Sequence, residues 1–252
     1  LIDFFLIFNS SIEPLDRHHL NWDKNDFLGR GSFGKVYKGT YFDQREYKDV
    51  AIKCLKKVRV SNDKQFEQFE RETSALSCLR HVNIIRFYGI CEINPKEWSI
   101  VMELANLGSL LDCYQDLTPS QASKVCLDLF QGLQYMHDKE YIHRDMKLEN
   151  ILLVGDDLNA FRAKIADFGL SREFGPAMTV GIQGTPHYIA PELIQAQSEI
   201  DYKIDVYSST IIIFELFTKN RFPIQFPSPQ EEYELKKAIK RSVKPQIPSY
   251  IP

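Results

Sequence analysis

The chain has 252 residues, 44% hydrophobic and 26% charged, a composition typical of a globular protein that excludes a disordered or fibrous one. Its formal charge of -3 gives no bulk attraction to nucleic acid, so we expect no nucleic-acid partner. Five scattered cysteines include no C-x-x-C pair, which argues against a zinc site or a disulfide framework. We therefore expect a cytoplasmic or other intracellular protein.

The first 21 residues are expected to flank the folded domain. The apolar stretch Leu1 to Phe8 is too short to cross a bilayer and lacks the basic flank of a signal peptide, so it gives no direct evidence of a membrane partner. Because the first residue is leucine rather than methionine, we expect an excerpt of a longer sequence or a fragment gene.

Residues 22–102 are predicted to form a small lobe of strands with one helix. Short strands are expected at 27–28, 36–41, 50–55, 84–91 and 99–104, separated by turn residues. A helix is expected over 62–80, where Phe66, Phe69, Leu76 and Leu79 recur at near-helical spacing.

Residues 103–252 are predicted to form a larger, mainly helical lobe, which makes the fold class α+β. Thr118-Pro119-Ser120-Gln121 is a capping box, and the apolar positions Ala122, Val125, Leu129, Leu133 and Met136 follow it on one face. A second helix, near 205–218, is apolar on most sides and is expected to be buried.

The first motif is Gly29-Arg30-Gly31-Ser32-Phe33-Gly34, which fits G-x-G-x-x-G. A dinucleotide-binding site would need a helix directly after this loop, but a strand is expected there. A Walker A loop fails because Val36 stands where a magnesium-binding hydroxyl is required. What remains is a flap whose backbone N–H groups approach phosphates, or, on this segment alone, a plain hairpin.

The second motif is the strand Val50-Ala51-Ile52-Lys53. Side chains alternate along a strand, so Ala51 and Lys53 share one face. The small side chain of Ala51 leaves room for a planar base, and the cation of Lys53 suits phosphate oxygens. A lysine that is merely solvated on a strand would give the same sequence pattern.

Further motifs follow at Glu72, His143-Arg144-Asp145 with Asn150, Asp167-Phe168-Gly169, and Ala190-Pro191-Glu192. In this order they resemble the signature set of protein kinases over residues 27 to about 220. The resemblance implies a two-lobe kinase fold, with a small antiparallel sheet plus one helix followed by a larger helical lobe. It also implies ATP and Mg²⁺ as cofactors and a protein substrate.

The resemblance assigns the catalytic roles residue by residue. Lys53 is expected to pair with Glu72, although Glu72 could equally be an exposed glutamate on a solvated helix. Asp145 would accept or orient the proton of the attacking hydroxyl. Asn150 and Asp167 would hold magnesium, whose preferred ligands are hard oxygens.

The resemblance also assigns the nucleotide pocket. The apolar members could equally be ordinary core residues. The expected set is Gly29, Gly31, Ser32, Phe33 and Gly34 over the phosphates, Leu28, Val36, Ala51 and Leu152 around adenine, Met102 as gatekeeper, and the backbone of Glu103 to Ala105 at the purine edge.

Two residues favour serine or threonine as the acceptor. Lys147 resembles the lysine that supports the transferring phosphate, and Thr185 resembles the threonine of the substrate platform that hydrogen-bonds toward the catalytic loop. The segments 84–89 and 108–110 look instead like the tyrosine-kinase-like group, many of whose members act on serine and threonine. A tyrosine or dual-specificity kinase stays open.

Regulation is expected at Arg144, which could pair with a phosphate on the activation loop. Thr179 is the first candidate for that phosphate, with an upstream activating kinase as partner; an ordinary exposed threonine is the alternative. The oligomeric state stays open.

Two features depart from the family pattern. Thr210 stands where glycine is expected and is predicted to crowd its helix. Asp205 follows the pattern, resembling the aspartate that braces the catalytic loop. The last helices of the lobe, with the arginine that would pair with Glu192, are expected to be missing, which keeps a nucleotide-binding pseudokinase or scaffold open as the alternative.

Overall fold

The computed structural model describes residues 12, 14–31, 34–56, 64–95, 97–174, 184–195, 201–221 and 237. The chain divides into two compact units. The first comprises Leu1–Asn106 with Asp167–Gly169, and the second comprises Leu107–Ala166 with Leu170–Pro252. Each unit is described on its own below.

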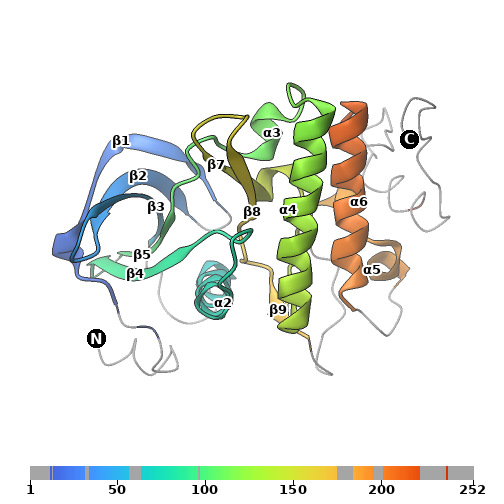
Figure 1. The fold of residues 1–252 in the computed structure, drawn as a ribbon. Helices are drawn as coiled ribbons and strands as arrows, with labels where there is room; N and C mark the ends of the chain where they lie inside the picture. The colour runs from blue at the N-terminus through green and yellow to red at the C-terminus, as the bar shows by residue number, and fades with distance from the viewer. Residues whose placement is uncertain are drawn as a thin grey trace. The chain divides into compact units, whose positions relative to one another are not determined.

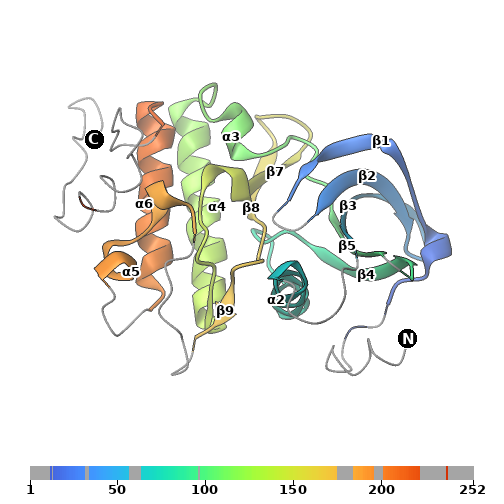
Figure 2. The ribbon, with the colours of Figure 1, turned by 180° about the vertical axis from the view of Figure 1, so that it is seen from behind.

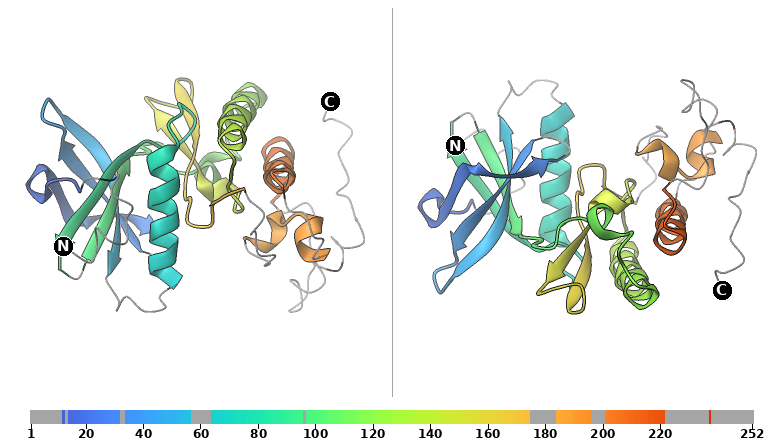
Figure 3. Two further views of the ribbon diagram at one scale, coloured as in Figure 1. Left: turned by 90° about the horizontal axis from the view of Figure 1, so that it is seen from below. Right: turned by 90° about the horizontal axis from the view of Figure 1, so that it is seen from above.

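The first unit is an antiparallel five-stranded sheet with one helix. The strands run in the order β1-β2-β3-β5-β4, and the sheet is strongly curved (Figure 1). The helix α2 packs against β3 and β4 and lies along the sheet in Figure 3. The elements are β1 (Leu20–Arg30), β2 (Lys35–Phe42), β3 (Tyr47–Lys56), α2 (Lys64–Cys78), β4 (Phe87–Asn94) and β5 (Glu97–Glu103).

Strand β3 forms the centre of this sheet, and its two faces differ as the alternation predicts. Val50, Ile52 and Cys54 are buried on one face, in a cluster that also contains Leu20 of β1. The intervening positions place Lys53 on the opposite face. The predicted helix is confirmed, with Phe69, Leu76 and Leu79 fully buried and Phe66 half-buried.

Part of the predicted flanking segment packs against the sheet. The backbone N–H of Leu15 donates to the carbonyl oxygen of Ile90 on β4 at 2.7 Å, which covers part of that edge strand. The chain then forms the short 3-10 helix η1 (Arg17–His19) and enters β1. Gly89 has φ +154, and a Cβ there would lie 2.8 Å from Cγ of Leu15.

The second unit is built on two helices, α4 and α6, which lie side by side in both Figure 1 and Figure 2. Two short antiparallel two-stranded sheets, β7–β8 and β6–β9, accompany them and had not been predicted. The elements are α3 (Leu110–Cys113), α4 (Pro119–Asp138), β6 (Tyr141–Ile142), η2 (Leu148–Asn150), β7 (Ile151–Gly155), β8 (Phe161–Ile165), β9 (Arg172–Glu173), η3 (Pro186–Tyr188), α5 (Pro191–Gln195) and α6 (Lys203–Thr218).

The helix predictions for this unit are confirmed at α4 and α6. The capping box is present, since the Thr118 hydroxyl accepts the Gln121 N–H, and the five predicted apolar positions of α4 are buried. In α6, Ile204, Ile211 and Leu216 are buried. The expected crowding at Thr210 is wrong, because this side chain is exposed and its hydroxyl donates to the Val206 carbonyl oxygen at 2.9 Å. In the part of the chain that the structure describes, none of the helices has the length and apolar character to cross a membrane.

Candidate active site

In the first unit, Lys53 on β3 contacts two carboxylates. Its Nζ lies 2.6 Å from Oε2 of Glu72 on α2 and 3.2 Å from Oδ1 of Asp167. The side chains of Lys53 and Glu72 are only 4% and 1% exposed. Of the two interpretations of Glu72, the solvated one is therefore wrong, whereas Glu67 on the same helix is exposed.

Burial and charge act against each other in this cluster. Burial works to lower the pKa of Lys53, but the charges of Asp167 and Glu72 outweigh it, so the lysine pKa is raised and the ammonium form persists. Burial also raises the pKa of Glu72 to about 7, against the lowering effect of Lys53. The ion pair is therefore sensitive to pH on the Glu72 side.

Asp167 has an unusual backbone. Its φ of 60° lies in the left-handed region, which aspartate tolerates better than most residues. The next residue, Phe168, is fully buried, and the Asp167 side chain keeps 25% of its surface exposed. A carboxylate that is anchored yet partly open can accept a hard cation.

The glycine loop makes a tight turn beside Lys53. The N–H of Gly31 donates to the Gly34 carbonyl oxygen at 2.8 Å. A Cβ at Gly31 would lie 2.6 Å from Cε of Lys53, and a Cβ at Gly34 would lie 1.8 Å from the carbonyl oxygen of Cys54. Glycine is thus required at Gly34, where the clash is with the backbone, whereas a Cβ at Gly31 would displace the end of the Lys53 side chain and a Cβ at Gly29 meets nothing within 4 Å. The predicted Ser32 and Phe33 lie outside the described residues.

Several predicted pocket residues of the first unit are neighbours in the sheet. Ala51 and Met102 are register partners and are buried, and Val36 pairs with Lys53. Leu28 is 53% exposed near the end of β1.

At the predicted purine edge, the N–H of Glu103 donates to the Arg86 carbonyl oxygen at 2.8 Å, and the role of the Glu103 to Ala105 backbone in binding a purine stays a prediction. Leu152 lies on β7 of the second unit, and its pocket role stays a prediction.

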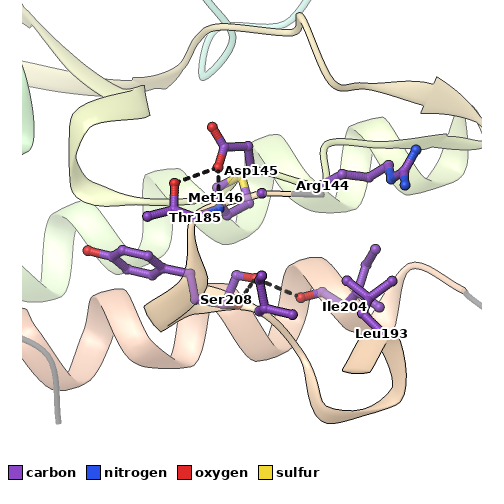
Figure 4. Close-up of a pocket in the computed structure, with 10 residues that line it drawn as sticks. Arg144, Asp145, Met146, Thr185, Leu193, Ile204 and Ser208 are labelled. Atoms are coloured by element: carbon purple, nitrogen blue, oxygen red, sulfur yellow. Dashed lines mark hydrogen bonds between the residues drawn. The ribbon is translucent and has the colours of Figure 1, made fainter. Parts of the chain in front are cut away.

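In the second unit, hydrogen bonds surround Asp145. Its Oδ1 accepts the hydroxyl of Thr185 at 2.9 Å and the Thr185 N–H at 3.1 Å (Figure 4). Its Oδ2 accepts Nζ of Lys147 at 2.7 Å and Nδ2 of Asn150 at 3.1 Å. Lys147 Nζ also donates to the Thr185 hydroxyl oxygen at 3.0 Å. Three predicted site residues, Lys147, Asn150 and Thr185, therefore meet at the carboxylate of Asp145.

Asn150 is oriented by the same contacts. Its Nδ2 also donates to the backbone carbonyl of Asp145 at 2.7 Å. Because the amide nitrogen is engaged twice with Asp145, the amide oxygen is the atom available to ligate a cation.

The backbone before Asp145 is held by Asp205 of α6. Oδ2 of Asp205 accepts the His143 N–H and Oδ1 accepts the Arg144 N–H, each at 2.8 Å. Arg144 has φ of 71°, a conformation that costs free energy in an arginine. The bracing role suggested for Asp205 thus has a geometric basis: its two hydrogen bonds fix this strained turn.

A small pocket lies beneath the turn that carries Asp145, as Figure 4 shows. Arg144 is 6% exposed and contributes to its wall. Gly184, with φ +109, also borders the pocket, and a Cβ there would lie 2.8 Å from the Arg144 carbonyl oxygen. The lining residues are Arg144, Asp145, Met146, Gly184, Thr185, Tyr188, Ile189, Leu193, Ile204 and Ser208. The predicted phosphorylation site, Thr179, lies outside the described residues.

Sequence reasoning missed a second polar cluster in this unit. Glu215 of α6 is fully buried and accepts the Tyr188 hydroxyl at 2.7 Å. Arg221 contacts both Glu215 and Glu149. The available signal was a carboxylate inside the apolar run from Ile211 to Phe217, since a buried charge requires a partner.

Comparison with known proteins identifies a matching family and several relatives. The family model described as "Protein kinase domain" matches residues 22–249. The dual specificity protein kinase shkB of Dictyostelium discoideum is 34% identical over 252 residues, which covers 94% of this chain and 36% of that protein. The serine/threonine-protein kinase STY46 of Arabidopsis thaliana is 31% identical over 226 residues, 88% of this chain and 37% of that protein.

Another relative, mitogen-activated protein kinase kinase kinase 1 of Arabidopsis thaliana, is 36% identical over 204 residues, 79% of this chain and 32% of that protein. The chain therefore spans about a third of the length of these three relatives.

Proposed function

The chain belongs to the protein kinase domain family, and on that premise we propose that it transfers the γ-phosphate of ATP to serine or threonine hydroxyls of a protein substrate, using Mg²⁺. The observation that carries the proposal is the set of contacts around Asp145, where Lys147, Asn150 and Thr185 all donate to one carboxylate.

Asp145 is proposed as the group that orients the substrate hydroxyl and takes its proton. As the hydroxyl oxygen bonds to the γ-phosphorus, the bond from that phosphorus to the ADP oxygen breaks, and the proton passes to the carboxylate. Lys147, at 2.7 Å from Asp145, places a positive charge beside the position where the phosphoryl group transfers. Thr185 holds Asp145 and supports the assignment to serine or threonine.

Lys53 is proposed to bind ATP phosphates, with Glu72 holding it in place. The tight approach of Gly31 to Lys53 supports this role, because a side chain on Gly31 would occupy the space beside the ammonium group. Asp167 and Asn150 are proposed to ligate magnesium, and both present hard oxygen atoms that suit this ion. Bound magnesium would neutralise part of the negative charge of the ATP phosphates.

The adenine is proposed to contact apolar residues of β3 and β5 and the backbone of the segment that follows β5. Ala51 and Met102 support this because they are register partners in the sheet, and the backbone of Glu103 to Ala105 is proposed to hydrogen-bond the purine edge. The further proposed contacts are Leu28, Val36 and Leu152.

Dual specificity remains the second candidate, because one relative carries that name. Regulation through Arg144 and a phosphorylated Thr179, placed there by an upstream kinase, also stays a proposal; the name of one relative, a kinase of a kinase cascade, is compatible with it.

The test is phosphate transfer from Mg-ATP to a library of peptides with serine, threonine or tyrosine acceptors. The proposal expects transfer to serine and threonine that is lost in Asp145→Ala and kept in Asp138→Ala, a matched change at an exposed aspartate on α4. Transfer to tyrosine as well would favour the dual-specificity candidate. A folded chain that binds ATP and transfers nothing, including after treatment with activating kinases, would support the pseudokinase alternative.

A further inference from the structure

Arg221 follows α6 in the chain and contacts two glutamates. Its Nη2 donates to Oε1 of Glu149 at 2.7 Å, and its Nε lies 3.3 Å from Oε1 of Glu215. The other oxygen of Glu215 accepts the Tyr188 hydroxyl at 2.7 Å. The guanidinium therefore links three elements of the second unit, η2, α6 and η3, through one series of charge-assisted contacts.

Both ends of this series lie next to groups that hold Asp145. Glu149 directly precedes Asn150, whose amide donates to Oδ2 of Asp145. Tyr188 ends η3, the short turn that starts after Thr185, and the Thr185 hydroxyl donates to Oδ1 of Asp145. The two oxygens of the carboxylate are thus held by two segments, and Arg221 is connected to each of them.

The electrostatics explain why the series depends on the arginine. Glu215 is fully buried, and a buried carboxylate without a compensating charge destabilises the surrounding structure. Burial, and after it the charge of Glu215, raises the pKa of Tyr188, so this hydroxyl stays protonated and donates. The η3 turn is additionally fixed by Ser208, whose hydroxyl donates to the Tyr188 carbonyl oxygen at 2.7 Å.

We propose that Arg221 is a positioning residue for phosphoryl transfer, which holds the Glu149–Asn150 segment and the Thr185–Tyr188 turn in register around Asp145. This inference rests on the proposed function and adds to it a residue that makes no contact of its own with Asp145 in the structure. Arg221 acts through Glu149 on one side and through Glu215 and Tyr188 on the other.

The geometry requires an arginine rather than any cation. The two carboxylates are reached by different nitrogens, Nη2 and Nε, of one planar group. A lysine offers a single ammonium on a flexible stem and cannot reproduce both contacts at once. Arg221→Lys therefore keeps the charge near Glu215 while breaking the bridge, which separates positioning from simple charge balance.

The experiment compares Arg221→Lys, Glu149→Gln and the double variant in the full chain. We expect each single change to lower kcat by about ten- to a hundredfold, because small displacements of catalytic groups have effects of this size. KM for ATP is expected to stay within about threefold of its original value. The kcat of the double variant should lie within about threefold of that of the slower single variant, because both changes break the same connection.

The matched control is Arg162→Lys. Arg162 lies on β8 of the same unit, is 47% exposed and pairs with Asp128 at 3.6 Å, so the same chemical change there should leave kcat within about twofold. A purely structural role for Arg221 would lower the thermal midpoint and the fraction of ATP-binding protein, while kcat per folded chain stayed normal. That outcome, or additive effects in the double variant, would overturn the proposal.

Hydrogen–deuterium exchange gives a readout that does not need activity. Arg221→Lys should speed exchange in peptides that cover residues 145–150 and 184–188, with α4 unchanged. Unchanged exchange in both peptides would overturn the proposal. If the unsubstituted chain transferred no phosphate at all, the proposed function would fail, and the exchange result would still decide whether Arg221 orders the two segments.

Discussion

The hydroxyl of Thr185 donates to Oδ1 of Asp145 at 2.9 Å, and the backbone N–H of the same threonine donates to the same oxygen at 3.1 Å. Lys147 closes the arrangement, since its Nζ lies 2.7 Å from the other carboxylate oxygen and 3.0 Å from the Thr185 hydroxyl. The turn that resembles the substrate platform of protein kinases is thereby tied to the proposed catalytic carboxylate.

Replacing Thr185 by valine should slow phosphate transfer while preserving the fold. Valine keeps the shape of threonine but removes the hydroxyl that both donates to Asp145 and accepts from Lys147. We expect kcat to fall by about tenfold or more, which corresponds to ~1.4 kcal/mol of transition-state stabilisation. Steady-state kinetics on a serine peptide measures this. Thr185→Ser retains the hydroxyl and serves as the control, expected within about threefold of the original rate; equal rates for all three chains would contradict the role.

Asp205→Asn should destabilise the second unit. Asp205 is fully buried and accepts the N–H groups of His143 and Arg144, and an asparagine would offer one oxygen and turn an NH₂ group toward a donor. We expect a loss of about 2–4 kcal/mol in the free energy of unfolding, since a buried N–H without an acceptor is costly. Urea denaturation measures the loss. Asp156→Asn, at an exposed position after β7, should change stability by less than about 0.5 kcal/mol.

Much of the fold could be predicted because its signals are local. The Thr118 capping box located the start of α4, and the alternation around Lys53 placed Ala51 on the same face of β3. The strand at 84–91 was displaced, since β4 begins at Phe87 and ends at Asn94. Ile84 is a fully buried apolar residue that precedes the strand. The apolar pattern cannot distinguish a buried residue before a strand from a residue within it.

The unpredicted features depend on contacts between distant segments. The β7 and β8 strands are five residues each, and their apolar runs were not separable from the surrounding loops. The docking of Leu15 on Ile90 joins residues 75 positions apart, for which a single sequence carries no local signal. Likewise, nothing in the sequence around Arg221 indicates that Glu149, 72 positions earlier, is its partner. Motifs therefore identified the residues of the site and the bracing residue Asp205, whereas the contacts of Arg221 with Glu149 and Glu215 required the structure.

Activity should fall as the pH drops through about 7, because burial raises the pKa of Glu72 to about 7. Below that pH the carboxyl group takes up a proton and no longer balances the charge of Lys53 at 2.6 Å. The sign for stability is opposite. Between pH about 4.5 and about 7 the folded chain holds a proton that the unfolded chain has released, so the free energy of unfolding contributed by Glu72 decreases as the pH rises through this window.

A pH profile of kcat/KM for ATP, measured for the unsubstituted chain and for Glu72→Gln, checks this assignment. It should run from about pH 5 to about pH 9, roughly two units on each side of the raised pKa of Glu72. The glutamine variant should be slower at neutral pH by about tenfold, because it lacks the negative charge that orients Lys53. Its profile should also lose the acidic limb near pH 7. An acidic limb that persists in Glu72→Gln would assign the titration to another group.

Two alanine substitutions in the glycine loop should separate a glycine that the structure requires from one that it does not. A Cβ at Gly34 would lie 1.8 Å from the carbonyl oxygen of Cys54, which directly follows Lys53 on β3, so Gly34→Ala must displace one of the two strands. We expect the affinity for ATP to fall by about tenfold or more, since the lysine moves with its strand. Gly29→Ala is the matched control for the displacement of β3, because a Cβ there meets nothing within 4 Å, and its thermal midpoint should stay within about 2 °C of that of the unsubstituted chain.

Titration of each chain with a fluorescent ATP analogue, together with its thermal midpoint, provides the measurement. A lower midpoint in Gly34→Ala is expected alongside the lost affinity, because both follow from the same displacement of β3. If Gly34→Ala bound the nucleotide as tightly as the unsubstituted chain, the close approach of the glycine loop to β3 would not govern ATP binding, and the loop would act as an ordinary hairpin, the alternative that the isolated motif left open.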